Sequence, residues 1–522
     1  MRRRHLLAGL GVLAAPSIAQ TQNSRVLRFV PSTGLVILDP VWTPTTPTLP
    51  FGLAVYESLF SVDEHLVPHI QMASGYTIEE DVKRWVFKLR EGLRFHDGEP
   101  VLARDCTASI DRWMKRDAVG KTLALRLNAL EAPDDRTVVF RLKKPFPQLP
   151  FALGKAQPNL LPIMPARIAA ADPGTQVKEI VGSGPFRFVP DEFQPGSLAV
   201  MARFDRYVPR QEAPNGTSGG RVAKFDRVEW QAIPDPATAA SALIKGEVDW
   251  VETPLTDLLP ALRASRDVTA GVFNPHGTLP MLRPNFVSGP TANPAIRRAI
   301  LAALDQSEMM AAVTGSEPGS STTPIGVYAP GSPSASRAGM ERVGPKPPAE
   351  IKAMLKDAGY KNERIVLLHP TDQPANDAMC QVIARRLTEA GFNIDDQTMD
   401  FATLVMRRNK REAPDAGGWS LLIPLAPGAD HVSPMVALAL RTGPAAWIGW
   451  PEDSRVEDLR EQWIDTGDVA EQKRLADKIQ DLALEDVLLI PLGHYTQKSA
   501  WRSNLSGILK APYPVMWNVS KS

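Results

Sequence analysis

The feature that most restricts the possible folds is a strand, a helix and a second strand in direct succession. A strand pattern runs from Arg364 to Leu368, a helical pattern from Asn376 to Ala390, and another strand pattern from Asn393 to Met399. Parallel neighbours cannot be joined by a tight turn, so this order is typical of two parallel strands joined by a covering helix. The second half of the chain is therefore predicted to contain an α/β unit with a mainly parallel sheet.

The chain of 522 residues is longer than the roughly 250–300 at which a single core stops growing, so at least two lobes are expected. Alternating or apolar runs predict strands, and runs with a period near 3.6, with their capping residues, predict helices. The predicted strands cover Val26 to Val30, Lys83 to Phe95, Phe225 to Ile233 and Val487 to Leu492, and the predicted helices cover Gly52 to Phe60, Pro236 to Lys245, Pro294 to Gly315, Pro348 to Ala358 and Asp468 to Glu485.

The N-terminus has the pattern of an export signal. Residues 2–4 are arginines, an apolar stretch follows from Leu6 to Ala15, and Ser17-Ile18-Ala19 resembles a cleavage site. The apolar stretch is about half the length that spans a bilayer. We therefore expect residues 1–19 to be a signal peptide removed after Ala19, read either by the Sec route or by the twin-arginine route.

The two cysteines bear on where the exported protein resides. A lipoprotein needs a cysteine at its cleavage site, whereas Cys106 and Cys380 lie deep in the chain. We therefore expect a free periplasmic protein in which both cysteines are buried thiols rather than a disulfide framework.

Motifs of several enzyme classes are missing from the sequence. There is no phosphate-binding loop, no Gly-x-Ser-x-Gly nucleophile elbow and no His-Glu-x-x-His, and His65 and His69 are separated by Pro68, which argues against a metal-binding helix. The 59 basic residues are balanced by 58 acidic ones, so no basic surface for nucleic acid is expected. We expect no catalytic residue, no metal site, no cofactor and no nucleic-acid partner.

Several strings in the chain resemble one family in their order and spacing. They are Tyr56-Glu57-Ser58-Leu59-Phe60, the run from Trp85 to Pro100 with Phe95-His96-Asp97-Gly98, Gly182-Ser183-Gly184-Pro185-Phe186, Gly246-Glu247-Val248-Asp249, Ile296-Arg297-Arg298-Ala299-Ile300 and Ala358-Gly359-Tyr360. Together they resemble the family 5 extracellular solute-binding proteins, the peptide- and nickel-binding receptors of bacterial ABC importers. The resemblance covers essentially the whole chain after the signal.

The resemblance implies a fold and a function. The fold would be α/β and two-lobed, in the type II periplasmic binding class, with mixed sheets, helices on their faces and an extra N-terminal subdomain. Lobe one would comprise residues 20–278, with the subdomain at about 51–180, lobe two residues 279–489, and residues 490–522 would return to lobe one. The protein would be a monomer that captures a peptide-like or other small organic solute for an inner-membrane ABC permease. A secreted hydrolase on the same scaffold, and a receptor for sensing or an extracytoplasmic chaperone, are the alternatives.

The same resemblance indicates candidate ligand-binding residues. Gly418, Trp419 and Ser420 match the family's cleft-lining Gly-Trp segment, and aromatic rings bury a large area with little loss of rotamer freedom. The further candidates are Trp447 and Trp450, Tyr56 and Glu57 in a segment that approaches the ligand, Arg283 and Asn285 near the first hinge crossing, and His494 and Tyr495 near the second. Core packing for the tryptophans and an ion pair or helix cap for Glu57 are the structural alternatives.

One departure from the family's pattern concerns the ligand. In the peptide receptors an aspartate three residues after this tryptophan pairs with the ammonium of the peptide. Here the equivalent residue is Leu422, and Asp430 is the next carboxylate along the loop. Burying an unpaired ammonium beside a leucine costs several kcal/mol. We therefore expect a ligand that is blocked, neutral or anionic at that end, unless Asp430 supplies the charge.

Overall fold

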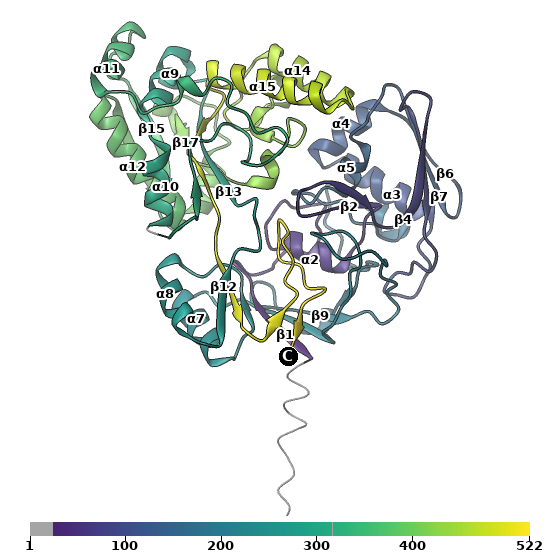
Figure 1. Ribbon diagram of the computed structural model, residues 1–522. Coiled ribbons are helices and arrows are strands. Elements are labelled where there is room, and N and C mark those ends of the chain that lie inside the picture. Colours follow the sequence, from purple (N-terminus) through teal and green to yellow (C-terminus); the bar gives the residue numbers. More distant parts are fainter. Residues whose placement is uncertain (1–24, 316) are drawn as a thin grey trace, which may run out of the picture.

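Two large sheets and a smaller third one organise the chain into two lobes and a subdomain. The structure is a computed structural model that describes residues 25–315 and 317–522, so the expected signal peptide lies outside the described residues. Figure 1 shows lobe two above lobe one, with the subdomain beside both. The two-lobed α/β architecture expected from the sequence is confirmed.

Lobe one is built on a seven-stranded mixed sheet in the order β12-β21-β11-β1-β10-β9-β8. The central strand β1 pairs in parallel with β10 and β11, whereas β9 and β21 are antiparallel to their neighbours. Its elements are β1 (Val26–Val30), α2 (Thr48–Val55), β8 (Phe186–Phe188), β9 (Leu198–Arg203), β10 (Arg227–Gln231), α7 (Pro236–Lys245), β11 (Trp250–Val251), α8 (Leu259–Ala264), β12 (Val268–Gly271) and β21 (Ser499–Arg502), with a short hairpin of β22 (Leu505–Ser506) and β23 (Ser520–Lys521) near the C-terminus.

Local signals explain why α7 begins and ends where it does. The side chain of Asp235 accepts a hydrogen bond from the amide of Thr238, and Pro236 occupies the first turn, where no amide hydrogen is needed. Gly246 closes the helix with a φ of 77°, in the left-handed region that favours glycine. The sequence predicted these bounds correctly.

The subdomain is an antiparallel four-stranded sheet, in the order β4-β5-β7-β6, covered by helices. Trp85 and Phe87 of β5 face the core, as their alternation with polar residues predicted. The elements are β2 (Phe60–Val62), β3 (Pro68–Ile70), β4 (Ala73–Glu79), β5 (Arg84–Leu89), α3 (Ala103–Met114), α4 (Ala118–Arg126), β6 (Leu127–Asp134), β7 (Thr137–Leu142), α5 (Leu149–Gly154) and α6 (Ala166–Ala169). Its buried residues join one hydrophobic cluster with residues of lobe two, so the two units pack against each other.

Lobe two is built on an eight-stranded sheet around β13. The pair β15 and β16 is parallel and α12 joins the two strands, which confirms the unit predicted from the sequence. The elements are β13 (Thr278–Pro284), α9 (Pro294–Ala303), α10 (Gln306–Thr314), β14 (Ser321–Thr322), α11 (Pro348–Asp357), β15 (Arg364–Pro370), α12 (Pro374–Ala390), β16 (Asn393–Met399), α13 (Phe401–Arg407), β17 (Leu421–Leu422), β18 (Leu425–Pro427), α14 (Ser454–Asp465), α15 (Val469–Glu485), β19 (Ile490–Pro491) and β20 (His494–Tyr495).

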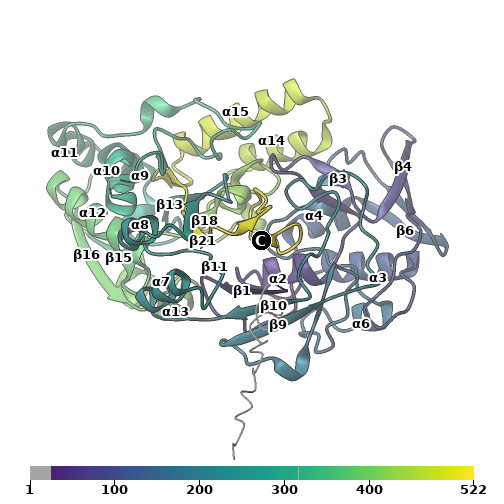
Figure 2. The same cartoon turned by 60° about the horizontal axis from the view of Figure 1, so that its bottom comes forward.

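Two segments cross between the lobes, from β12 to β13 and from β20 to β21; Figure 2 gives a second view of this region. The first crossing lies near residue 278. The second comes after Tyr495, because β19 and β20 pair with β13 and keep residues 490–495 in the sheet of lobe two.

Three local predictions differ from the structure. The helix expected from Pro294 to Gly315 is two helices, because Asp305 accepts from the amide of Ser307 and caps a new helix, α10. The helix expected at Gly52 to Phe60 ends at Val55, and the chain then becomes extended. Only Ile490–Pro491 of the expected final strand pairs. Cys106 and Cys380 are free and buried, as predicted.

Candidate ligand-binding cleft

A cavity of about 560 Å³ lies between the lobes. Lobe one contributes Thr33 and Thr46 from the loop after β1, and Tyr513 from the C-terminal segment. Lobe two contributes most of the remaining wall, from Met281, Gln373, Asn376, Phe401, Leu404, Arg408, Leu422, the segment 423–427, Asp430, His431, Leu438, Ala439 and Trp447. The volume and the mostly apolar lining are typical of a site for a small organic molecule.

Four residues of this wall carry buried polar atoms that have no hydrogen-bond partner within the described chain. The atoms are Oδ1 of Asn376, Nε of Arg408, Oδ1 of Asp430 and the hydroxyl of Tyr513. Most buried polar groups in folded proteins are paired, because an unpaired one costs about 1–3 kcal/mol. Four such atoms around one cavity are therefore candidate contacts for a polar ligand.

The Arg408 side of the cavity is electropositive. Arg408 follows the last residue of α13 and forms no ion pair in the described part of the chain, and burial lowers the pKa of its guanidinium. Gln373 and Asn376 bring the first turn of the 17-residue helix α12 to the same cavity, and its N-cap residue Gln373 makes no side-chain capping bond. Both features favour a negative group of a ligand.

The Asp430 side has the opposite character. Burial raises the pKa of Asp430 to about 7, and the nearby charges that act on this carboxyl are those of Lys155 and Asp117. Lys155 is itself paired with Asp117, at 3.0 Å between Nζ and Oδ2. Burial is the cause of the lowered pKa of Arg408, and Arg408 and Asp430 line the same cavity from different segments of lobe two. The neighbouring His431 is neutral at physiological pH, since burial lowers its pKa to about 4.

A smaller chamber of about 270 Å³ adjoins this side of the cleft. It shares Thr46, Leu425, Pro427 and Tyr513 with the larger cavity, so Tyr513 stands at the junction. Glu252, which follows β11 of lobe one, lines the chamber and accepts a hydrogen bond of 2.7 Å from the amide of Ser32. Tyr495, predicted to lie near the ligand, lines this chamber, whereas the ring of His494 bonds to the main-chain carbonyl of His276.

The predicted Gly-Trp segment does not reach the cavity. Trp419 is fully buried, packs with Val366, Leu404 and Leu422, and donates from Nε1 to the carbonyl of Arg408 at 3.1 Å. Ser420 is equally buried within the sheet. A Cβ on Gly418 would lie 1.9 Å from the carbonyl oxygen of Glu412, so this glycine serves a close approach of two main chains. These three residues are therefore core, and Leu422, two residues further along the chain, faces the cavity.

The two other tryptophans differ from each other. Trp447 lines the cavity, and the guanidinium of Arg283 lies 5.9 Å from the centre of its ring. Trp450 is outside the wall; it packs on Trp419 at 6.0 Å between ring centres and lies under the guanidinium of Arg411. Trp450 is thus a packing residue in this structure.

Four other candidates are also internal rather than at the cavity. Tyr56 is buried in the core of lobe one. Glu57 accepts hydrogen bonds from the hydroxyl of Tyr207 and from the amide of Gln71, and it pairs with Arg90, which matches the ion-pair alternative. Arg283 donates to the main-chain carbonyls of residues 439, 448 and 488 behind the cavity wall, and Asn285 donates to that of Trp419.

Sequence reasoning missed Asn376, Arg408, Glu252 and Tyr513. Arg408 stands in the basic run 407–411, which is typical of a solvated surface. Tyr513 lies in the loop that follows β22, and Glu252 directly follows a two-residue strand. None of these positions has a motif around it, because each becomes a site residue only when segments distant in the chain meet.

Charged side chains also join the subdomain to lobe two outside the cleft. Arg126 lies 2.6 Å from Glu461 and 3.1 Å from Asp465, and Lys144 pairs with the same two carboxylates at 3.0 and 3.1 Å. These four residues, termed here the charged latch, connect α4 and the segment after β7 to α14. They tie the subdomain, which the sequence placed within lobe one, to lobe two.

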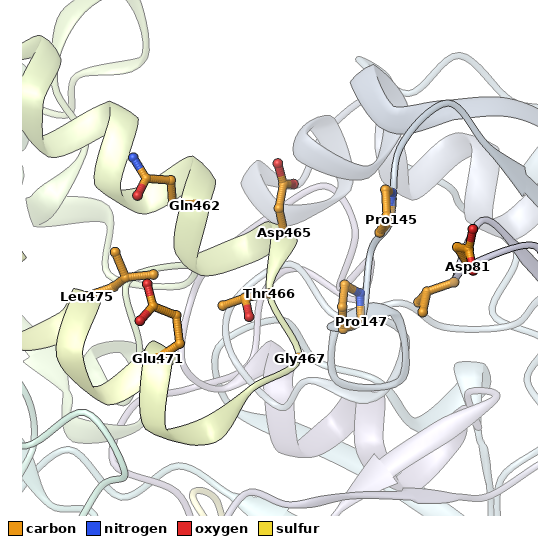
Figure 3. Close-up of a pocket in the computed structure, with 10 residues that line it drawn as sticks. Asp81, Pro145, Pro147, Gln462, Asp465, Thr466, Gly467, Glu471 and Leu475 are labelled. Carbon is orange, nitrogen blue, oxygen red and sulfur yellow. The ribbon is translucent and has the colours of Figure 1, made fainter.

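A hollow of about 670 Å³ lies beside the latch, where the loop carrying Pro145 and Pro147 faces the turn between α14 and α15 (Figure 3). Its wall includes Asp81, Asp465 and Glu471. None of its lining residues carries a buried atom without a partner within the described chain. The interlobe cavity, with four such atoms, is therefore the better ligand site.

Residues 25–315 and 317–522 contain neither of two other kinds of site. No group of three or more His, Cys, Asp or Glu side chains there could hold a metal ion. No helix in the same residues combines the length and the apolar character needed to cross a membrane.

Comparisons with known proteins agree with this architecture. A probable peptide ABC transporter periplasmic-binding protein of Sinorhizobium fredii is 34% identical, over 99% of this chain and 98% of its own. The glutathione-binding protein of Escherichia coli is 25% identical over 97% of this chain and 96% of its own. A periplasmic binding protein of A. tumefaciens in complex with agropinic acid shares the fold, with a TM-score of 0.77 and 22% identity over 95% of this chain and 99% of that one.

The family model of the bacterial extracellular solute-binding proteins, family 5, matches residues 67–437, which is more than half of the chain. Together with the relative from S. fredii and the two-lobed fold around an interlobe cavity, this match shows that the protein belongs to the family 5 extracellular solute-binding proteins of bacteria.

Proposed function

We propose that the protein is exported to the periplasm and captures a small acidic organic solute between its lobes for an inner-membrane ABC permease. The periplasmic and ABC-transport names of its relatives support the compartment and the partner, and the N-terminal signal pattern supports export. Because ligand contacts come from both lobes, binding favours the closed arrangement. A monomer suffices for this role, since the cavity is lined by one chain.

The observation that carries the choice of an acidic solute is the unpaired Arg408 beside Leu422. A half-buried cation whose Nε has no partner within the described chain favours a ligand carboxylate, because charge-assisted hydrogen bonds are about twice as strong as neutral ones. The first turn of α12 adds its positive end at the same side of the cavity. An ammonium at this position would meet a like charge and an apolar side chain. The ligand end that lies here is therefore anionic, as in a carboxylic acid.

Trp447 supplies the apolar part of the site. Its ring lines the cavity, and the guanidinium of Arg283 lies 5.9 Å from the centre of this ring. An exposed ring face in a cavity binds the flat or aliphatic part of a solute at little entropic cost. The agropinic acid bound by the A. tumefaciens relative is itself an acid, which agrees with this assignment.

The direct test is mass spectrometry of small molecules released when the purified protein is denatured. We expect a compound with at least one carboxyl group that rebinds the refolded protein and leaves it chemically unchanged. Calorimetry with a di- to pentapeptide library and its C-terminally amidated counterpart tests the ligand class. Submicromolar binding that survives amidation of the terminal carboxyl group would contradict the assignment of an acidic solute. Turnover of the compound would contradict a receptor role.

Arg408→Gln is the matching variant, because it keeps the aliphatic stem as far as Cδ and a polar end but removes the charge. We expect at least tenfold weaker binding of the acidic solute, with an unchanged unfolding curve. Arg411→Gln is the control, since Arg411 lies over Trp450, outside the cavity. Equal affinities for the two variants would show that Arg408 does not meet the ligand.

A further inference from the structure

The junction between the large cavity and the small chamber brings together two carboxyl groups from different lobes. Asp430 of lobe two lines the large cavity and Glu252 of lobe one lines the chamber. Tyr513 lines both spaces, and its pKa is raised by burial and by the negative charges of both carboxylates. The hydroxyl of Tyr513 is buried and has no partner within the described chain.

Neither carboxyl group has a cation of its own. The cation that acts on Asp430 is Lys155, which is already held by Asp117 and by the main-chain carbonyl of Pro158 at 2.7 Å. The hydrogen-bond partner of Glu252 is Ser32, and no charged side chain of the described residues acts on its pKa, which burial raises. Buried carboxyl groups are ordinarily paired, because a buried unpaired charge is costly.

We infer that this junction binds a positively charged nitrogen of the ligand between Asp430 and Glu252, with the hydroxyl of Tyr513 as a further contact. The inference rests on the proposed function, because it assigns a second group of the same solute. With a carboxylate at Arg408 and an amine at the junction, the solute is zwitterionic. Its amine lies away from Leu422, where peptide receptors of the family bind the ammonium.

The position of the junction links ligand charge to closure of the lobes. Asp430 follows β18 of lobe two, whereas Glu252 and Tyr513 belong to lobe one. An amine held between them contacts both lobes at once, so it stabilises the closed arrangement more than a neutral group of the same size. Solutes with the amine are therefore favoured in both affinity and closure.

The test compares three mixed sets of N-acetylated dipeptides by calorimetry with the full chain. The first set ends in lysine, the second in norleucine, and the third in norleucine amide, so that the sets differ in one charge at a time. We expect the lysine set to bind at least tenfold more tightly than the norleucine set. Asp430→Asn and Glu252→Gln should each remove this preference, whereas the control Asp415→Asn should keep it, because the Asp415 side chain is 90% exposed.

A pH series gives a second readout. With the pKa of Asp430 at about 7, its carboxylate is mostly ionised at pH 8 and mostly protonated at pH 6. The affinity for the lysine set should fall about tenfold between these values, and Asp430→Asn should flatten the profile. Lys155, Asp117 and Tyr513 are the other titratable groups that face Asp430, and His431 stays neutral across this range.

The outcomes separate the two proposals. Equal binding of the lysine and norleucine sets, with weaker binding of the amide set, would overturn the amine site and leave the acidic-solute site standing. Binding of the amide set as tightly as the acids, or no binding by any set, would overturn both. A lysine preference that survives in both carboxyl variants would also overturn the amine site.

Discussion

Trp419 and Trp447 offer a direct test of the structure, because the sequence assigned both to the ligand and the structure separates them. Trp419 has no exposed surface and packs in a cluster with Val366, Leu404 and Leu422. Replacing a fully buried tryptophan by alanine typically costs 3–5 kcal/mol, which includes the cavity left behind. Trp419→Ala should therefore lower the free energy of unfolding by about 4 kcal/mol.

Trp447→Ala should show the opposite behaviour. Its ring faces the ligand cavity and is only partly buried, so the cost in unfolding free energy should stay below about 1 kcal/mol. Loss of a ring that packs on the ligand should weaken binding by about 1–2 kcal/mol, or roughly tenfold.

Trp419→Phe is an intermediate case. It keeps an aromatic ring but loses the hydrogen bond to the carbonyl of Arg408, which should lower the free energy of unfolding by about 1 kcal/mol.

The assay is urea unfolding followed by circular dichroism, together with calorimetric titration of the compound released from the purified protein. The free energy of unfolding and the affinity are then measured on the same samples. If Trp419→Ala unfolds with the wild-type free energy but no longer binds the ligand, the assignment of this ring to the core is wrong, because the ring would then contact the ligand. Large destabilisation by Trp447→Ala would equally contradict its place in the cavity wall.

Four further predictions follow from other parts of the molecule. Glu461→Gln weakens the charged latch by about 0.5–1 kcal/mol, so solution scattering of the ligand-free variant should show a larger radius of gyration than the wild type. An unchanged radius of gyration would show that the latch does not help to hold the lobes closed. The pKa of Asp430 is about 7 in the folded protein and 3.8 ordinarily, so its contribution to stability is complete below pH 3.8 and is lost as the pH rises through 7. The free energy of unfolding of the ligand-free protein should therefore fall across this window. Asp430→Asn should remove that part of the decline. Arg283→Met leaves three buried carbonyls without donors and should cost about 1–3 kcal/mol in urea unfolding, while a neutral effect would contradict its contacts. Lysines at Arg3 and Arg4 should block secretion by the twin-arginine route and barely affect the Sec route, as fractionation of cells would show.

The local elements and the two-lobed architecture could be predicted from the amino-acid sequence alone. The run from Arg364 to Met399 predicted a parallel unit, and the structure has it, because apolar periodicity and glycine helix ends act within about 20 residues. Helix α7 was predicted to the residue for the same reason. The order of motifs along the chain was enough to indicate the family, since the family's fold is specified by the whole collinear pattern.

The site was predicted only where a residue's surroundings are local. Leu422 was identified as an apolar position in the ligand wall from its place in one short segment, and it lines the cavity. Trp419, three residues earlier, was assigned to the ligand, although its side chain enters the core. Both side chains belong to the same hydrophobic cluster, and only the packing of the sheet against its neighbours decides which of the two reaches the cavity wall.

The charged groups that face the cleft could not be predicted in this way, because they depend on tertiary contacts. Arg408, Asp430, Glu252 and Tyr513 come from four separate segments, and nothing in the sequence near any of them indicates a partner. Whether a charged side chain is solvated, paired or left open to a ligand depends on which other charges lie within a few ångströms and on how much water remains. Both quantities are set by contacts between distant parts of the chain, so they exist only once the lobes have packed.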